Sequence, residues 1–136
     1  MSSPTTKNLS NVYRDYIRAI LEHDIDALDQ YVSKDVVHNG KQLGLHGYKD
    51  LILRNIMEND LQIEIKRLIA DENHVAAVLI LTTCSSTKGL PMVGIDLNGQ
   101  TFSFAENVIY DFKNGKIGEV QSLVDVDTIR SYARQP

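Results

Sequence analysis

The sequence has 136 residues, 43% of them hydrophobic, so it is long enough for one compact domain and too short for two of ordinary size. Its 18 acidic and 14 basic residues give a formal net charge of -4, and no run of Lys or Arg could follow a phosphate backbone, which argues against a nucleic-acid-binding protein. The longest apolar run, 75–81, is far shorter than a membrane span, and the first ten residues do not resemble a signal peptide. We therefore expect a soluble, cytoplasmic protein, and its one cysteine, Cys84, cannot form an internal disulfide.

The chain is predicted to begin with a short tail and two helices. Residues 1–7 are polar and are expected to form a disordered tail ahead of a single domain over 8–136. Apolar residues then recur at helical spacing over 9–21, with charged residues on the opposite face. Asp24 or Asp26 can cap a short second helix after the interruption at His23, and this helix is expected to carry Ala27, Leu28, Tyr31 and Val32.

The next segment joins the helices to a sheet. Residues 35–38 are predicted to be extended, and 39–47 hold three glycines and are predicted to be a loop. A third helix is expected to begin at Tyr48 and to end near Glu58-Asn59-Asp60. The period of the apolar residues then changes to two, which predicts four strands, over 61–70, 74–85, 102–112 and 116–126.

Two hairpins connect these strands. Asp71-Glu72-Asn73 has the composition of a tight turn, and Asn114-Gly115 is a strong hairpin signal because both residues tolerate positive φ. The loop 87–100 links the hairpins. Helices followed by long antiparallel strands indicate an α+β domain in which one sheet packs its inner face on the helices. A strongly curved sheet would leave a pocket between sheet and helices, which is the default ligand site.

The motifs that are missing narrow the chemistry. The histidines at 23, 38, 46 and 74 lack metal-ligand spacing, so no metal is expected. The sequence also lacks the motifs of acyl-enzyme formation, nucleotide hydrolysis and dinucleotide redox chemistry. Acid/base chemistry without a cofactor, or ligand binding alone, remains. An oxygenase that needs iron or a flavin is disfavoured.

Glu106 is the first candidate for acid/base chemistry. Alternation along 102–112 places it in one row with Phe102, Phe104, Tyr110 and Phe112. A carboxyl group there would lose solvent, which raises its pKa and suits a general acid or base. The alternative is that Glu106 lies at a sheet end with a water or Arg partner, because structural ion pairs also perturb acids.

Asp125 is the second candidate. Strict alternation from Ile117 places it on one face with Glu119, Gln121 and Leu123. Asp127 precedes a possible helical turn and is expected to cap it, which leaves Asp125 without a structural role. We predict that Asp125 and Glu106 point into one cavity. The alternative is that Asp125 itself caps or forms a turn.

His38 is the third candidate. It precedes the glycine-rich loop and could exchange protons near neutrality at the mouth of the pocket. The alternative is a hydrogen-bonded structural or surface histidine.

Four stretches carry a resemblance to a known family: "YRDYIRAILEHDIDALDQYVSKDVVHNG", "GLHGYKDLI", "GIDLNGQTFSFAENVIYDFKNGKIGEV" and "SLVDVDTI". With them the chain resembles the SnoaL-like polyketide cyclases of the nuclear transport factor 2-like superfamily. The resemblance implies a cone-shaped α+β barrel and a cofactor-free aldol-type ring closure. It also implies an acid/base role for Asp125 and a homodimer, and His38 matches a histidine often seen in these cyclases.

The departures from the family lie around the pocket. Asp96-Leu97-Asn98 fills a loop that usually reads Pro-Pro-Thr, Gln121 stands where a tryptophan is common, and "ARQP" replaces the usual C-terminal Gln-Leu-Gly. These residues would touch the pocket lining and mouth, so the substrate stays open. Fold alone does not transfer function.

The leading hypothesis is a lyase or isomerase that acts on a small hydrophobic, polyketide-like or terpenoid-like ligand. Asp125 would move the proton, and Glu106 or His38 would orient the substrate oxygen or relay the proton. The substrate would contact Tyr16, Tyr48, Phe104 and Gln121. The competing hypothesis is a ligand-binding or dimerisation module of the same fold without chemistry.

Overall fold

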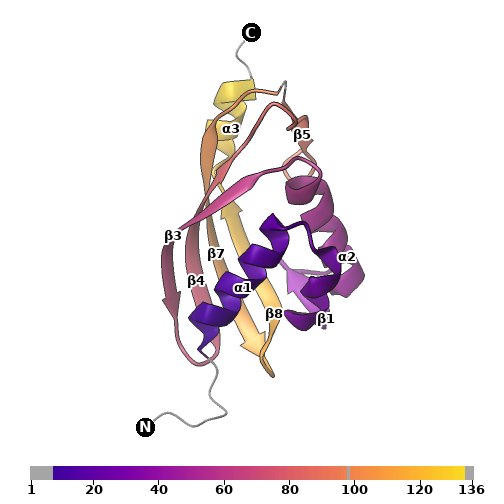
Figure 1. Cartoon of the computed structure of the whole chain (residues 1–136), viewed down its shortest axis with the longest axis vertical. Coiled ribbons are helices and arrows are strands. Elements are labelled where there is room, and N and C mark those ends of the chain that lie inside the picture. The colour runs from indigo at the N-terminus through magenta and orange to yellow at the C-terminus, as the bar shows by residue number, and fades with distance from the viewer. Residues whose placement is uncertain (1–7, 98, 134–136) are drawn as a thin grey trace.

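The computed structural model describes residues 8–97 and 99–133 (Figure 1). The predicted tail at 1–7 lies outside the described residues. Elements follow one another in the order α1 (Leu9–Leu21), η1 (Ile25–Gln30), β1 (Val32–His38), β2 (Lys41–Gln42), α2 (Gly44–Ile52), η2 (Leu53–Met57), β3 (Gln62–Ala70), β4 (His74–Thr82), β5 (Gly89–Leu90), β6 (Ile95–Asp96), β7 (Ser103–Lys113), β8 (Lys116–Val124) and α3 (Val126–Ala133). Within the described ranges, no helix is long and apolar enough to cross a membrane.

The first helix forms where the sequence predicts it, whereas the second is a 3-10 helix that ends at Gln30, so that Val32 begins β1 instead. The Asn8 side chain caps α1 by accepting a hydrogen bond from the Ser10 amide, at 3.0 Å. The apolar face of α1 is buried, as its helical spacing requires. Asp24, one of the two predicted caps, accepts a hydrogen bond from the Ala27 amide at the start of η1.

The third helix begins earlier than predicted and ends near Glu58, as predicted. It begins at Gly44, four residues before the predicted start at Tyr48, because the turn at Asn39-Gly40 lets β2 pair with β1 and shortens the loop. Its last turn, η2, is a π-helix in which the Glu58 amide reaches the Leu53 carbonyl. Such π turns often occur at functional sites.

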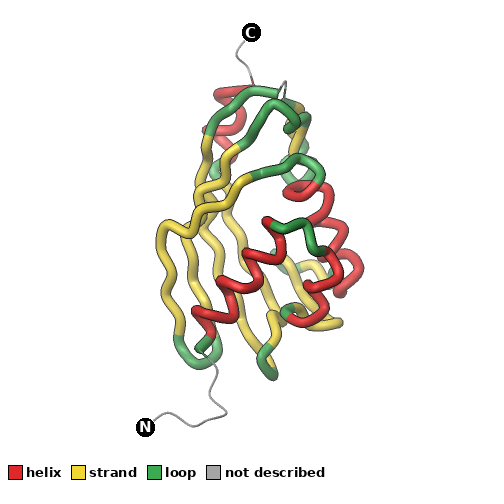
Figure 2. Tube along the Cα trace, in the orientation of Figure 1, coloured by secondary structure: helices red, strands yellow, loops and turns green. Residues whose placement is uncertain are grey.

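One six-stranded sheet runs in the order β2-β1-β8-β7-β4-β3. All neighbours are antiparallel except β1 and β8, which are parallel. The sheet curves around the helices α1 and α2, which cover the same face (Figure 2). This arrangement confirms the predicted α+β fold with helices on a curved, mostly antiparallel sheet. The four long strands are also confirmed, although β4 ends at Thr82 rather than Ser85.

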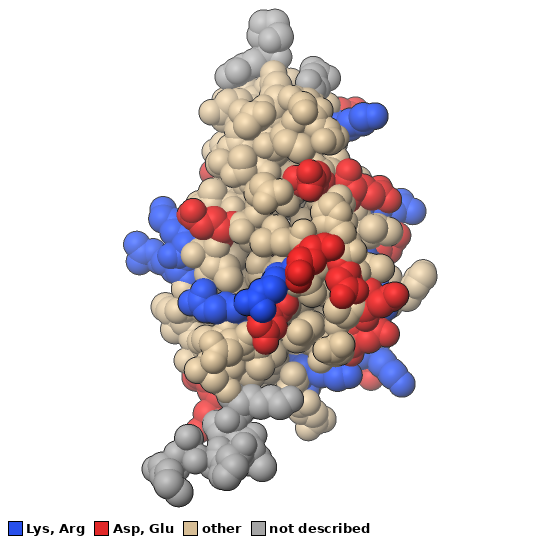
Figure 3. Space-filling view, in the orientation of Figure 1, with Lys and Arg blue, Asp and Glu red and all other residues tan. Residues whose placement is uncertain are grey.

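The core lies between the helices and the inner face of the sheet. Its fully buried side chains come from both layers and include Tyr13, Tyr16, Ile20, Leu28, Leu81 and Ile117. On the face shown in Figure 3, basic side chains lie next to acidic ones. Some charged side chains of the protein form ion pairs, as Lys49 does with Asp29 and Arg54 with Asp50. Exposed pairs of this kind contribute little stability.

A β-bulge changes which residues of β8 face the core. Phe112 pairs with Ile117, but the preceding residue, Asp111, pairs with Glu119, so Gly118 is extra. A bulged residue shifts the alternation that follows it. Val120 is consequently buried, whereas Gln121 and Leu123 are exposed on the outer face.

Candidate functional site

A small cavity lies between the helices and the inner face of the sheet. Its volume is about 40 Å³, which is room for one or a few water molecules and far less than an organic ligand needs. Most of the lining is aliphatic, with six polar side chains among it: Tyr16, His38, Tyr48, Asn55, Glu106 and Tyr110.

Glu106 brings the carboxyl group of the site. The regular pairing of β7 with β4 keeps it in the inward row with Phe104, Val108 and Tyr110, all buried. Its described hydrogen-bond partner is the Ser122 hydroxyl on β8, which donates to Glu106 Oε2. Burial raises the pKa of Glu106, and the Ser122 hydrogen bond partly offsets that rise. The site therefore holds a carboxyl group that takes up a proton more readily than one in water.

Two hydrogen-bonded pairs of tyrosines lie close enough to this carboxyl group to interact with its charge. The hydroxyl oxygens of Tyr16 and Tyr48 lie 2.6 Å apart, and those of Tyr13 and Tyr110 lie 3.1 Å apart. Burial raises the pKa of all four, so they remain neutral hydrogen-bond donors. A pair of hydroxyl groups uses one hydrogen for its mutual bond, and the other hydrogen can be donated to an oxygen in the cavity.

His38 closes another side of the cavity. It ends β1, where it pairs with Val120, and its ring centroid lies 6.2 Å from that of Tyr48. Burial lowers the pKa of His38, which favours the neutral imidazole. A neutral ring can accept a proton or a hydrogen bond.

Asp125 lies outside the cavity, so the prediction that it shares one cavity with Glu106 is wrong. It is exposed at the N-terminus of α3, where it accepts hydrogen bonds from the Thr128 amide (3.2 Å) and the Thr128 hydroxyl (2.7 Å). These bonds lower the pKa of Asp125. Asp125, not Asp127, is the cap. The bulge at Gly118 is the physical reason, because it turns the predicted inward face of β8 outward.

The predicted substrate-binding residues divide into two groups. Tyr16 and Tyr48 line the cavity. Phe104 is buried beside Phe102, with ring centroids 6.1 Å apart, and is not among the lining residues. Gln121 is exposed opposite Ile109 on the outer face of the sheet, so its predicted place in the lining is wrong for the same reason as that of Asp125.

The hairpin formed by β5 and β6 makes the roof of the cavity. Asn55 in η2 accepts a hydrogen bond from the Met92 amide at 2.8 Å, and Met92 lines the cavity. Buried Asn59 donates to the Gly89 carbonyl at 2.6 Å and accepts from the Lys88 amide. The end of η2 thus holds the hairpin through side-chain amides. Sequence patterns did not single out either asparagine.

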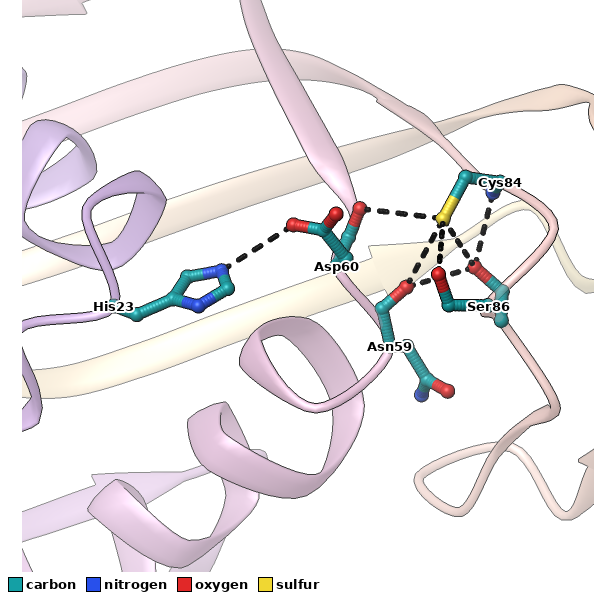
Figure 4. Close-up of polar contacts among 6 residues, drawn as sticks. His23, Asn59, Asp60, Cys84 and Ser86 are labelled. Carbon is teal, nitrogen blue, oxygen red and sulfur yellow. Dashed lines mark hydrogen bonds and ion pairs between the residues drawn. The ribbon is translucent and has the colours of Figure 1, made fainter.

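Cys84 falls within the predicted strand 74–85, but the structure places it as a half-buried thiol in the loop after β4. Figure 4 shows it on the opposite side of Asp60 from His23, whose ring nitrogen lies 3.4 Å from the Asp60 carboxylate. The thiol contacts the carbonyls of Asn59 and Asp60 and the Ser86 hydroxyl, and hydrogen bonds from Ser86 lower its pKa. These contacts tie the loop after β4 to the turn after η2.

Two open hollows lie elsewhere on the surface. A groove of about 980 Å³ beside the β5–β6 hairpin carries both signs of charge, from Arg54, Glu58, Lys88 and Asp96. A second hollow, of about 540 Å³, lies beside Asp125. Of the residues that the structure describes, no three His, Cys, Asp or Glu are grouped to hold a metal ion. Chemistry without a metal or cofactor stays a prediction.

Comparison with known proteins places this geometry in a family. The family model described as SnoaL-like polyketide cyclase matches residues 10–131. No curated protein matches the sequence. A SnoaL-like polyketide cyclase from Agrobacterium tumefaciens is 31% identical, with a TM-score of 0.83, over 92% of this chain and 97% of that one.

More distant structures share the fold. TsrD from Streptomyces laurentii is 18% identical, with a TM-score of 0.80, over 98% of both chains. An NTF2-like protein of unknown function from Cytophaga hutchinsonii is 14% identical, with a TM-score of 0.67, over 94% of this chain and 99% of that one. Helices on a curved, open sheet are thus the NTF2-like fold, and the chain belongs to the SnoaL-like polyketide cyclase family.

Proposed function

We propose that the protein is a cofactor-free acid/base enzyme of the cyclase or isomerase type, in which Glu106 moves the proton. The observation that carries this proposal is a buried carboxyl group, bonded to the Ser122 hydroxyl, in a cavity that also holds the hydroxyl pair of Tyr16 and Tyr48. Groups of this kind, with environments that push their pKa values apart, define acid/base pairs. Membership of a cyclase family supports the reaction class.

The proposed reaction begins at a carbon next to a carbonyl group of the substrate. The Glu106 carboxylate removes a proton from that carbon, and its raised pKa makes it a stronger base than an exposed carboxylate. The Tyr16–Tyr48 pair donates its remaining hydrogen to the enolate oxygen, which stabilises the developing charge. In a cyclisation the enolate carbon then bonds to a second carbonyl carbon within the substrate, and Glu106 returns the proton to the resulting alkoxide.

His38 has a supporting place in this proposal. Its ring lies beside Tyr48 in the lining, and the neutral imidazole can accept a hydrogen bond from a substrate hydroxyl or from a tyrosine. It would thereby orient the substrate rather than supply the main base.

The ligand proposed is small, hydrophobic and polyketide-like or terpenoid-like, because the lining is mostly aliphatic and aromatic. A cavity of about 40 Å³ must enlarge to admit it. Met92 is the flexible side chain of the roof, and its hairpin is held by Asn55 and Asn59. We propose that the ligand enters by displacing this roof.

Deuterium exchange tests the proposal without knowledge of the natural substrate. The protein is incubated in D₂O with cyclohexanone, a small ketone, and the loss of the proton signal next to the carbonyl is followed by NMR. Glu106→Gln is expected to reduce the protein-dependent exchange rate about 10²- to 10⁴-fold. Asp125→Asn is the matched control and should exchange at the wild-type rate.

Two outcomes would count against the proposal. If the wild-type protein binds the ketone but does not accelerate exchange, the ligand-binding module without chemistry is the better description. If Glu106→Gln exchanges at the wild-type rate, another group is the base.

A further inference from the structure

The loop after β1 holds the strand segment that contacts Glu106. The Asn39 side chain accepts a hydrogen bond from the Ser122 amide at 2.8 Å and donates one to the Ser122 carbonyl at 3.2 Å. The last residue pair between β1 and β8 is His38 with Val120, so Ser122 lies beyond the paired strands. β1 has ended at this point, and the Asn39 carboxamide takes the place of a further β1 peptide group beside Ser122. It can do so because a carboxamide offers the same donor and acceptor as a peptide group.

We propose that Ser122, held by Asn39, is a positioning residue that fixes the Glu106 carboxyl group in the cavity. This inference rests on the proposed acid/base role of Glu106. It assigns a part in the site to a loop residue that is itself exposed, and it connects that loop to the cavity through one serine.

The register of the sheet supports this role. Glu106 pairs with Val124, and Ser122 pairs with Val108, so Glu106 and Ser122 are diagonal neighbours on the inner face. β8 ends at Val124, two residues after Ser122, and strand ends move more than strand centres. The two bonds from Asn39 restrain the backbone at this point, and the Ser122 hydroxyl is thereby kept in reach of Glu106.

The conformation of Asn39 suits this task. Its φ is 48°, in the left-handed region that Asn adopts more readily than other non-glycine residues. Asn39→Gly therefore keeps the backbone conformation while it removes both hydrogen bonds to Ser122. This substitution therefore tests the side-chain contact with Ser122 separately from the turn.

Ser122 differs from the other polar groups near Glu106 because it forms a hydrogen bond with the carboxylate. The other groups come from α1, α2, β1 and β7 and are Tyr13, Tyr16, Tyr48, His38 and Tyr110. Within residues 8–97 and 99–133, Ser122 is the hydrogen-bond donor recorded for this carboxylate. A donor to the charged form favours ionisation, whereas burial opposes it.

The test is the titration of Glu106 in the full chain, followed through the ¹³C signal of its carboxyl carbon. Glu106→Gln assigns the signal because it removes that signal. Ser122→Ala is expected to move the titration midpoint upward by on the order of one pH unit, because a hydrogen bond to a charged group is lost. Asn39→Gly should move it in the same direction by less, and Ser122→Thr, which keeps the hydroxyl group, should stay near wild type.

A matched control separates this effect from general damage. Ser103→Ala removes a serine of β7 that bonds Thr82 on the exposed side of the sheet, and it should leave the midpoint unchanged. A wild-type midpoint in Ser122→Ala would overturn the proposal, and a wild-type midpoint in Asn39→Gly would remove Asn39 from it. The titration needs no substrate, so a protein that shows these shifts but fails to exchange deuterium would refute the proposed function alone.

Discussion

Removal of the Asp125 side chain should loosen α3 and leave the cavity untouched. Asp125 caps α3 through the amide and hydroxyl groups of Thr128, at 3.2 and 2.7 Å. The helix is anchored further along by buried Ile129 and by Tyr132, whose ring stacks on Phe102 at 4.4 Å. Asp125→Ala therefore destabilises the first turn while these anchors keep the helix in place.

The expected size follows from the loss of one helix cap in a chain of this length. The melting temperature should fall by about 4 °C in a calorimetric or circular-dichroism melt. Asp127→Ala is the control, because the Asp127 charge lies in the first turn of α3 but its side chain does not cap the helix. The melting temperature of this variant should fall by about 1 °C. Both melts are run in 0.5 M salt, which screens the charge effect and spares the cap bonds.

Two results would contradict the assignment of Asp125 as the cap of α3. A larger fall for Asp127→Ala than for Asp125→Ala would make Asp127 the cap. Asn is as good a cap as Asp, so Asp125→Asn should melt as wild type and exchange deuterium as wild type. Loss of exchange at an unchanged melting temperature would mean that Asp125 carries the chemistry and that the cavity does not.

Three further predictions concern Glu106, the roof and the outer face of the sheet. The folded-state pKa of Glu106 lies above its ordinary value of 4.5, so the folded protein binds this proton more tightly than the unfolded chain and loses stability as pH rises from that value through the raised one. Urea unfolding should show Glu106→Gln gaining on wild type over that range, and parallel pH curves would contradict the burial of a titrating carboxyl group. Met92→Ala should admit the larger ketone 2-tetralone, seen as tighter binding in an NMR titration; unchanged binding would mean that Met92 does not close the cavity. The homodimer stays a prediction that light scattering checks, and the wild type should be a dimer. Leu123→Asp puts a charge among the exposed apolar side chains Ile69, Ile109 and Leu123, so this variant should be a monomer. A monomeric wild type would make the dimer prediction wrong.

Local patterns predicted those parts of the molecule that depend on local structure. The helical spacing over 9–21 and the alternation over 102–112 survive in α1 and β7, because both elements are regular along their length. Glu106 was placed on the inner face for this reason. Its hydrogen-bond partner could not be predicted from local patterns, because Ser122 lies on another strand.

The error at Asp125 has one cause. Alternation carried through Gly118 takes no account of an extra residue, and a bulge is a property of two paired strands rather than of one sequence. A glycine inside a predicted strand, three residues after the hairpin Asn114-Gly115, was the available signal. The bulge moved Gln121 and Asp125 out of the predicted lining and brought Ser122 into contact with Glu106.

The contact between Asn39 and Ser122 had no sequence signal. The two residues are 83 positions apart, and they meet because β1 lies next to β8 in the sheet and parallel to it. A parallel pair between distant strands leaves no turn to read in the sequence. The hydrogen bond between Asn55 in η2 and the Met92 amide likewise joins residues 37 positions apart and has no local signal.

The location of a bound ketone shows whether the inner cavity beside Glu106 is the substrate site. A crystal structure of Glu106→Gln grown with saturating cyclohexanone distinguishes the inner cavity from the two open hollows. We expect the ketone in an enlarged inner cavity, with its oxygen at the Tyr16–Tyr48 pair and with Met92 displaced. A ketone found only in the groove at Arg54 and Lys88, or only beside Asp125, would contradict this expectation.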